Sequence, residues 1–182
     1  MKILIFWEQS SWGGVDSHLL TLLNLWKDNN DSFVIVHNKK NSGLKRIKKM
    51  INLNENKIDY ISFNSISYNS LSSSLNSKFL KLFFPILYLF KPFLIFLMSI
   101  RLFFIFKKIK DVDVLFANNG GYPGANGCIS ALIAANWLNI KGKVLMIHHA
   151  ATKFGILLMT FEKVLDRYLS NIIDVIICPS NA

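Results

Sequence analysis

The chain has 182 residues, enough for one α/β domain, or slightly more than one, with a substantial buried core. Aliphatic and aromatic residues make up 52% of it, charged residues only 18%, and the mean hydropathy is +0.34. We therefore expect apolar surface that a bilayer or a further domain covers. The net charge of +10 favours an anionic partner. Because many cations lie beside apolar runs and no nucleic-acid-binding motif is present, we expect a membrane surface and no nucleic acid.

The cysteines and the N-terminal residues indicate in which cellular compartment the chain is expected. Cys128 and Cys178 lack the spacing of a zinc site or a disulfide framework, so we expect two buried thiols. Only Lys2 precedes an apolar run that already ends at Glu8, which is too short for a secretory signal. We therefore expect a cytoplasmic chain.

The first predicted elements are a strand, a glycine turn and a helix. A buried strand from Ile3 to Trp7 leads through a polar stretch to Gly13-Gly14, and a helix begins near Val15. Paired glycines permit a close backbone approach and a helix N-terminus attracts anions, so this turn can receive a phosphate or a polar sugar. The third glycine of the dinucleotide-binding fingerprint is missing, which leaves an ordinary tight turn as an equal alternative. The apolar face of the helix consists of Val15, Leu19, Leu22, Leu23 and Trp26.

Strands from Phe33 to His37 and from Ile58 to Phe63 are each followed by a segment of unusual composition. Residues 39–49 hold six lysines and arginines. A solvated helix face is the simpler interpretation, and a binding site for lipid head groups is the alternative. Residues 64–78 are mostly Ser and Asn, and we expect them to form a mobile polar loop.

Residues 79–106 form an apolar, phenylalanine-rich segment that a Lys or Arg interrupts at every tenth residue. No uncharged run reaches the roughly 18 to 20 residues of a spanning helix, and two prolines interrupt helical hydrogen bonding. We expect residues 92–108 to pack on the sheet and residues 79–91 to form a helix in the membrane interface. A crossover helix buried against the sheet is the alternative. The residues expected to meet the bilayer are Phe83, Phe84, Leu87, Phe90 and Lys91.

The next two predicted strands end in residues that can contact a ligand. The strand from Val112 to Ala117 runs into the glycine-rich loop 118–124. The strand from Val144 ends at His148, and His149 starts the loop after it. In a doubly wound sheet, ligands bind beyond the carboxyl ends of the strands, so we expect this loop, the histidines and the glycine turn to converge. Turn formation and a structural histidine are the simpler interpretations of each feature taken alone. The histidine pair has no carboxylate or cysteine nearby, so no metal is expected.

The remaining predicted elements are a helix from Phe154 to Leu169 and a strand from Ile172 to Cys178. The apolar face of this helix consists of Leu157, Phe161, Val164, Leu165 and Tyr168. Short apolar strands that alternate with helices predict an α/β fold with a doubly wound, Rossmann-like parallel sheet and crossover helices. No arrangement typical of a Ser-His-Asp hydrolase, a Walker-type nucleotidase or a two-carboxylate glycosidase is present.

Four motifs, in this order, resemble the N-terminal domain of glycosyltransferase family 4, whose members contain two Rossmann-like domains in the GT-B fold. Residues 13–18, Gly-Gly-Val-Asp-Ser-His, are similar to the family's Gly-Gly-x-Glu-x-His turn. Residues 113–118 and 144–149 are similar to its strand ends, and residues 175–182 to its closing strand and turn. Asp16 stands where Glu is commoner and His149 where Asp or Asn is commoner.

The resemblance implies that residues 1–182 form the acceptor-binding half of a retaining glycosyltransferase, with a nucleotide sugar as co-substrate and no metal cofactor. It places Gly13 and Gly14 near the donor phosphates or the transferred sugar, and His148, as the catalytic contact, near the reacting carbon. The expected substrate-binding residues are Gly13, Gly14, His18, Asn118, Asn119, Gly120, Gly121, Tyr122 and His149. The acceptor would be a polysaccharide or a lipid-linked saccharide, and the chain would bind peripherally to the inner face of the cell membrane.

The nucleotide-binding half is expected outside this chain, on a further domain or on a separate partner chain. The 182 residues alone should therefore transfer sugar weakly or not at all. A noncatalytic, membrane-associated partner subunit with a Rossmann-like fold is the alternative. A nucleic-acid-binding protein is a third hypothesis, which rests on charge alone.

Overall fold

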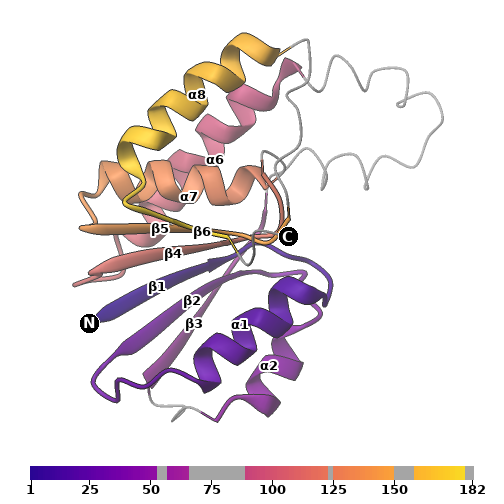
Figure 1. Ribbon diagram of the computed structural model, residues 1–182, viewed down its shortest axis with the longest axis vertical. Helices are drawn as coiled ribbons and strands as arrows, with labels where there is room; N and C mark the ends of the chain where they lie inside the picture. The colour runs from indigo at the N-terminus through magenta and orange to yellow at the C-terminus, as the bar shows by residue number, and fades with distance from the viewer. Residues whose placement is uncertain (53–56, 66–88, 123–124, 150–157, 179–182) are drawn as a thin grey trace, which may run out of the picture.

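A computed structural model describes residues 1–52, 57–65, 89–122, 125–149 and 158–178. Six parallel strands form one sheet in the order β3-β2-β1-β4-β5-β6 (Figure 1). The strands are β1 (Lys2–Trp7), β2 (Ser32–Asn38), β3 (Ile58–Phe63), β4 (Val114–Asn119), β5 (Gly142–Ile147) and β6 (Val175–Ile177). This order confirms the predicted doubly wound α/β fold, since the chain builds outward from β1 in one direction and from β4 in the other.

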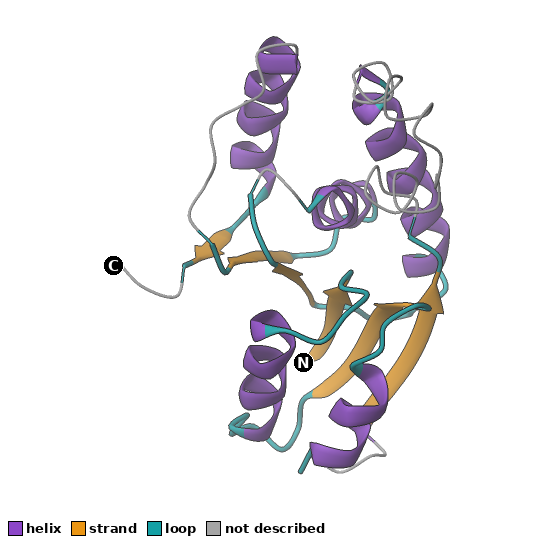
Figure 2. Ribbon diagram, turned by 90° about the vertical axis from the view of Figure 1, so that its right-hand side faces the viewer, coloured by secondary structure: helices purple, strands orange, loops and turns teal. Residues whose placement is uncertain are grey.

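Helices cover both faces of the sheet, as Figure 2 shows from the side. One face carries α1 (Gly14–Asn24) and α2 (Leu44–Met50), and the other carries α6 (Lys91–Phe106), α7 (Asn126–Trp137) and α8 (Met159–Ile172) (Figure 1). The side chains of β1 alternate between the two resulting cores. Ile5 and Trp7 pack in the core with α1, whereas Leu4 and Phe6 pack in the core with α6 and α7. Burial on both faces explains the continuous apolar runs of the strands.

Strand β4 lies further along the chain than its apolar run predicts. It begins at Val114 rather than Val112 and continues through Asn118 and Asn119. Asn118 pairs with Trp7 of β1 and with Met146 of β5. Pairing with both neighbouring strands therefore continues β4 beyond its apolar run. The two asparagines predicted to lie in a loop are therefore held by strand hydrogen bonds.

The apolar faces of two helices differ in detail from the prediction. In α1, Leu20 is buried and Leu22 is only partly buried, while Trp26 lies beyond the end of the helix. In α8, Val164 is 65% exposed and Tyr168 37% exposed. The buried residues of α8 are Glu162, Leu165, Leu169 and Ile172.

Lys91 is not a lipid-facing residue, which corrects the prediction. It is 6% exposed, and its Nζ lies 2.7 Å from Oε1 of Glu162, the buried carboxylate of α8. Pairing with Glu162 accounts for the burial of the Lys91 cation between α6 and α8. The remainder of α6 packs mainly against α7, and it reaches the sheet core at its C-terminal end, where the rings of Phe106 and Phe6 of β1 have centroids 6.4 Å apart.

Several predictions fall outside the described residues. The polar loop 64–78 is described only at residues 64 and 65, and Phe83, Phe84, Leu87 and Leu157 are not described. Within the described ranges, no helix has both the length and the apolar character needed to cross a bilayer. Cys128 is buried as expected, but Cys178 is exposed because it follows an edge strand.

Candidate functional site

The candidate site lies at the carboxyl edge of β1 and β4, which we call the β1–β4 edge. Glu8 and Gln9 follow β1, Asn118 and Asn119 end β4, and the neighbouring strand β5 is followed by His148. The loops after β1 and β4 lead to helices on opposite faces of the sheet (Figure 1). This is the topological switch point, where ligands bind in doubly wound sheets.

Three of the predicted site residues meet at this edge. Nε2 of His148 lies 2.9 Å from Oδ1 of Asn118, and Nδ2 of Asn118 donates a hydrogen bond to the backbone oxygen of Val15 at 3.4 Å. The rings of His18 and His148 meet edge to face, with centroids 4.9 Å apart. The helix after β1, the end of β4 and the end of β5 are therefore joined through His18, Asn118 and His148.

Partial burial lowers the pKa of His148, and the nearby imidazoles of His18 and His149 lower it further. His148 is consequently uncharged at neutral pH. Because the Asn118 amide donates towards Val15, its oxygen faces His148 and accepts a hydrogen from Nε2. The neutral ring then has an unprotonated Nδ1, which can accept a hydrogen bond from a hydroxyl group.

The glycine turn precedes α1 and is organised by Asp16. The fully buried carboxylate of Asp16 accepts hydrogen bonds from the backbone N–H of Gly13 and from Nε1 of Trp7, the latter at 2.6 Å. Burial raises the pKa of Asp16. Neither Gly13 nor Gly14 has a positive φ, and a Cβ on Gly14 would have no described atom within 4 Å. Neither packing within the described residues nor backbone conformation requires glycine at position 14, and the close ligand approach expected there stays a prediction.

The loop after β4 is anchored on both sides. Oδ1 of Asn119 accepts the N–H of Gly121 at 2.9 Å, and the Tyr122 hydroxyl donates to Asp166 of α8. Burial, together with Asp166, raises the pKa of Tyr122. A Cβ on Gly120 would lie 3.2 Å from Nε2 of Gln9, so glycine permits the close approach of Gln9. Tyr122 thus holds the loop against α8, while His149 is exposed next to Gly121.

Sequence reasoning missed three residues of this edge: Glu8, Gln9 and Asn126. The carboxylate of Glu8 accepts the N–H of Gly127, in the first turn of α7, at 3.0 Å and the Ser65 hydroxyl at 3.2 Å. Burial raises the pKa of Glu8. Gly127 has no space for a Cβ, because the Glu8 carboxylate occupies that position. In the sequence, only the position of Glu8 and Gln9 directly after a strand could have indicated that they belong to this edge.

Four buried polar atoms at this edge have no hydrogen-bond partner among the described residues. They are Oε1 of Gln9, Nδ1 of His18, Nδ2 of Asn119 and Oδ1 of Asn126. An unsatisfied buried polar group costs about 1–3 kcal/mol, so such a cluster indicates a place where a ligand or water completes the hydrogen bonds.

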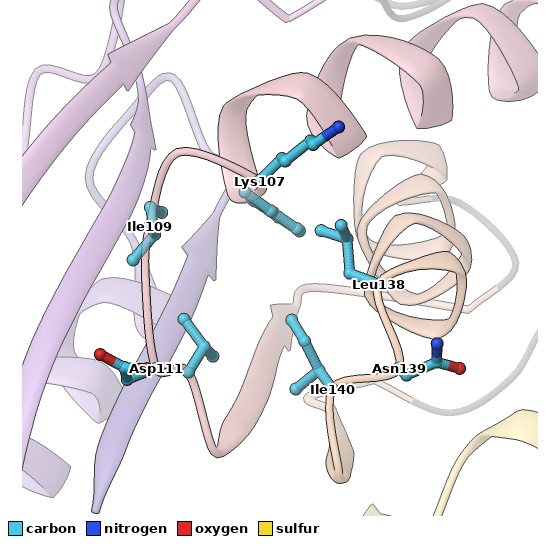
Figure 3. A pocket seen from close by; sticks show the side chains of 8 residues that line it. Lys107, Ile109, Asp111, Leu138, Asn139 and Ile140 are labelled. Carbon is cyan, nitrogen blue, oxygen red and sulfur yellow. The ribbon is translucent and has the colours of Figure 1, made fainter.

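The described residues also enclose a cavity away from the β1–β4 edge. A cavity of about 220 Å³ lies between the ends of α6 and α7, at the amino ends of β4 and β5 (Figure 3). Asp111 and Asn139, which line it, both adopt a positive φ, as Asp and Asn readily do where helices end. The cavity lies at the end of the sheet opposite the β1–β4 edge. Among the described residues, no group of three His, Cys, Asp or Glu side chains is placed to hold a metal ion.

Comparison with known proteins supports the fold. No protein-family model matches the chain, and no curated protein sequence matches it. Among solved structures, it is similar to MurG from Acinetobacter baumannii, a GT-B glycosyltransferase, with a TM-score of 0.56 and 14% sequence identity. The match covers 98% of this chain and 41% of MurG. The chain therefore has the fold of one half of a GT-B protein and spans less than half the length of that neighbour.

Proposed function

We propose that this chain is the acceptor-side half of a GT-B glycosyltransferase that transfers a sugar from a nucleotide-sugar donor. The observation that carries the proposal is the joined cluster of His18, Asn118 and His148 at the switch point of a GT-B half-domain. Ligands bind at this position in such sheets, and the cluster is built from residues that hydrogen-bond to sugars.

In this proposal, His148 contacts the substrate close to the reacting carbon. Asn118 fixes its orientation, and the lowered pKa keeps the imidazole neutral, so it can accept a hydrogen bond from a substrate hydroxyl. The contribution of this half is positioning, with stabilisation of the departing diphosphate left to groups outside the chain. A retaining reaction, with no metal cofactor, is the outcome that the resemblance to family 4 favours.

The acceptor that we propose is a polysaccharide or a lipid-linked saccharide, used at the inner face of the membrane. Exposed apolar residues of α6, together with Phe90 just before the helix, support this location. Phe90, Phe93, Leu97 and Phe104 are 37–58% exposed and recur at helical spacing, so they form one outward face. The same face supports the alternative of a noncatalytic, membrane-associated partner subunit.

The test is sugar transfer by the protein in the form in which the cell makes it. Nucleotide sugars that carry a labelled sugar would be tested one by one, and transfer of the label to acceptors in native membrane extracts would be measured. We expect transfer from one donor, and loss of about 100-fold or more in His148→Ala, typical of losing a contact made in the transition state. Asn136→Ala, on the last turn of α7, is the matched control and should keep full activity. Full activity in His148→Ala, or no transfer from any nucleotide sugar, would contradict the proposal.

A further inference from the structure

A groove of about 330 Å³ lies where α6, α7 and α8 meet, and we call it the helical groove. All three helices cover the same face of the sheet (Figure 1). The walls of the groove include Ile95 of α6, Ile133 of α7 and Leu165 of α8, which are only 3%, 8% and 9% exposed. Its volume is within the range of pockets that hold small ligands.

The lining of the helical groove suits an apolar ligand. Among the described residues that line it, none carries a charge. Its two hydroxyl groups already have partners: Ser99 donates to the backbone oxygen of Ile95 at 2.8 Å, and Tyr168 accepts a hydrogen bond from Asn136 at 3.3 Å. Because the polar groups of the described lining are engaged, hydrocarbon is the chemistry that its walls can cover.

The helical groove lies away from the candidate site. Helix α7 begins at the β1–β4 edge with Asn126, but only its last two turns, with Ile133 and Trp137, line the groove. At 1.5 Å per residue, Ile133 lies about 10 Å along the helix from Asn126. The buried ion pair of Lys91 and Glu162 joins the first turns of α6 and α8, at the end of the groove nearer that edge. A chain in the groove is therefore separated from the candidate site, which favours a membrane lipid over the tail of a glycosyl acceptor.

The rim of the groove is aromatic and continues into the exposed face of α6. Phe96, Trp137 and Tyr168 line the groove and are 53%, 38% and 37% exposed. The rings of Phe96 and Trp137 meet edge to face, with centroids 6.2 Å apart. Phe93, on the exposed face of α6, is three residues before Phe96 and therefore its neighbour on the helix surface. A lipid at that exposed face has a continuous apolar path into the groove.

The charges on α8 complement an anionic head group. Its two acidic side chains face inward contacts, Glu162 with Lys91 and Asp166 with the loop after β4. Its fully exposed charges are the cations Lys163 and Arg167. Exposed cations beside an apolar surface attract lipids with negatively charged head groups.

We propose that the helical groove binds one acyl chain of an anionic phospholipid, whose head group is attracted by the exposed cations of α8. The inference goes beyond the proposed sugar transfer, because this lipid is neither donor nor acceptor. It also goes beyond contact between the exposed face of α6 and a bilayer, because three helices enclose the chain.

The experiment titrates the full 182-residue chain with decyl phosphate, a single-chain anionic probe, below the concentration at which the probe forms micelles. Calorimetry gives the affinity and stoichiometry, and NMR of methyl groups locates the probe. We expect one bound molecule per chain and shifts in the methyl signals of Ile95, Ile133 and Leu165. Butyl phosphate should bind at least 100-fold more weakly, because each buried methylene strengthens binding about fourfold. Equal affinity for the two probes, or no binding of decyl phosphate, would overturn the proposal.

Variants test whether the probe occupies the groove. Ile133→Phe narrows the groove and should weaken decyl phosphate binding at least tenfold. Phe161→Ser removes a partly buried apolar wall and should weaken binding about three- to tenfold, and it remains informative if circular dichroism shows that Ile133→Phe does not fold. The matched control is Val164→Ser, on the exposed side of α8, which should bind as the unchanged chain does. Unchanged affinity in the folded groove variants would overturn the proposal.

A further probe distinguishes the two sources of hydrocarbon. Geranyl phosphate has as many carbon atoms as decyl phosphate, but its chain is a branched isoprenoid. We expect it to bind no tighter than decyl phosphate. Binding at least tenfold tighter would assign the groove to an isoprenoid-linked acceptor and overturn the assignment to a phospholipid.

Discussion

His148 is the residue whose chemistry depends most clearly on its surroundings. Its ring is partly buried, bonded to Asn118 and close to two other imidazoles. Burial and the two neighbouring imidazoles disfavour a positive charge on the ring, while Asn118 fixes its orientation. Its pKa is therefore lower than the ordinary value of about 6.5.

The first prediction concerns the titration of His148. NMR titration of its ring protons should give a midpoint below about 6.5. In His18→Ala the midpoint should rise towards the ordinary value without reaching it, because burial, the larger cause, remains. His37→Gln, on β2, is the control and should not move it. A midpoint at or above the ordinary value in the unchanged chain would contradict this account.

The lowered pKa of His148 also predicts how the free energy of unfolding changes with pH. The folded chain binds a proton at His148 less readily than the unfolded chain does. The contribution of His148 to the free energy of unfolding is thus complete above the ordinary pKa and is lost as the pH falls through the folded pKa. His148→Gln should reduce the loss of stability between neutral and mildly acidic pH, as urea unfolding at several pH values would measure.

At the scale of elements, the ion pair between Lys91 and Glu162 joins the first turn of α6 to the buried face of α8. Both side chains are almost fully buried, at 7% and 2% exposed. Through Asp166, α8 also holds Tyr122 and with it the loop after β4. The pair therefore fixes a helix that supports one side of the candidate site.

The second prediction is a double-mutant cycle on this pair. Lys91→Met should lower the free energy of unfolding by about 3–5 kcal/mol, because it leaves the Glu162 carboxylate buried without that cation. Lys91→Met combined with Glu162→Leu should recover most of the loss, because no buried charge remains. Urea unfolding measures both. Equal losses in the single and double variants would show that the ion pair is not the source of the effect.

The sequence predicted elements better than it predicted their ends or their partners. The strand Ile58–Phe63 was placed correctly because its apolar run coincides with the strand. The extension of β4 through Asn119 was missed because the neighbouring strands, far away in sequence, supply its hydrogen bonds. Lys91 was misplaced for the same reason, since its partner Glu162 lies 71 residues further along the chain.

At the scale of the whole molecule, the order of the strands determines which residues of the candidate site can be predicted from the sequence. The rule for doubly wound sheets correctly placed Asn118 and His148 at one edge, but it did not decide whether His18 faces that edge, as the structure shows it does. It could not assign roles to Glu8 and Gln9, because only the folded structure shows which helix N-terminus the Glu8 carboxylate reaches. The position of this edge thus followed from the pattern, and its internal hydrogen bonds did not.

The exposed aromatic side chains near α6 lie on one side of the sheet. The exposed face of α6, formed by Phe90, Phe93, Leu97 and Phe104, lies on the layer opposite α1 and α2 (Figure 1). Exposed aromatic side chains at helical spacing are typical of helices that lie in a bilayer interface, and the net charge of +10 adds attraction to anionic lipid.

The third prediction follows from this face. Replacing Phe90, Phe93 and Phe104 together by Ser should lower binding to anionic phosphatidylglycerol liposomes at least tenfold. Burying each ring in the interface contributes an appreciable part of the roughly 1.5–3 kcal/mol of a fully buried apolar side chain, so the loss of three exceeds a tenfold change. Cosedimentation measures the change. The matched control replaces Leu25 and Met50, exposed near α1 and α2, by Ser and should leave binding intact. If the triple variant sediments like the unchanged chain, another domain rather than the bilayer covers this face.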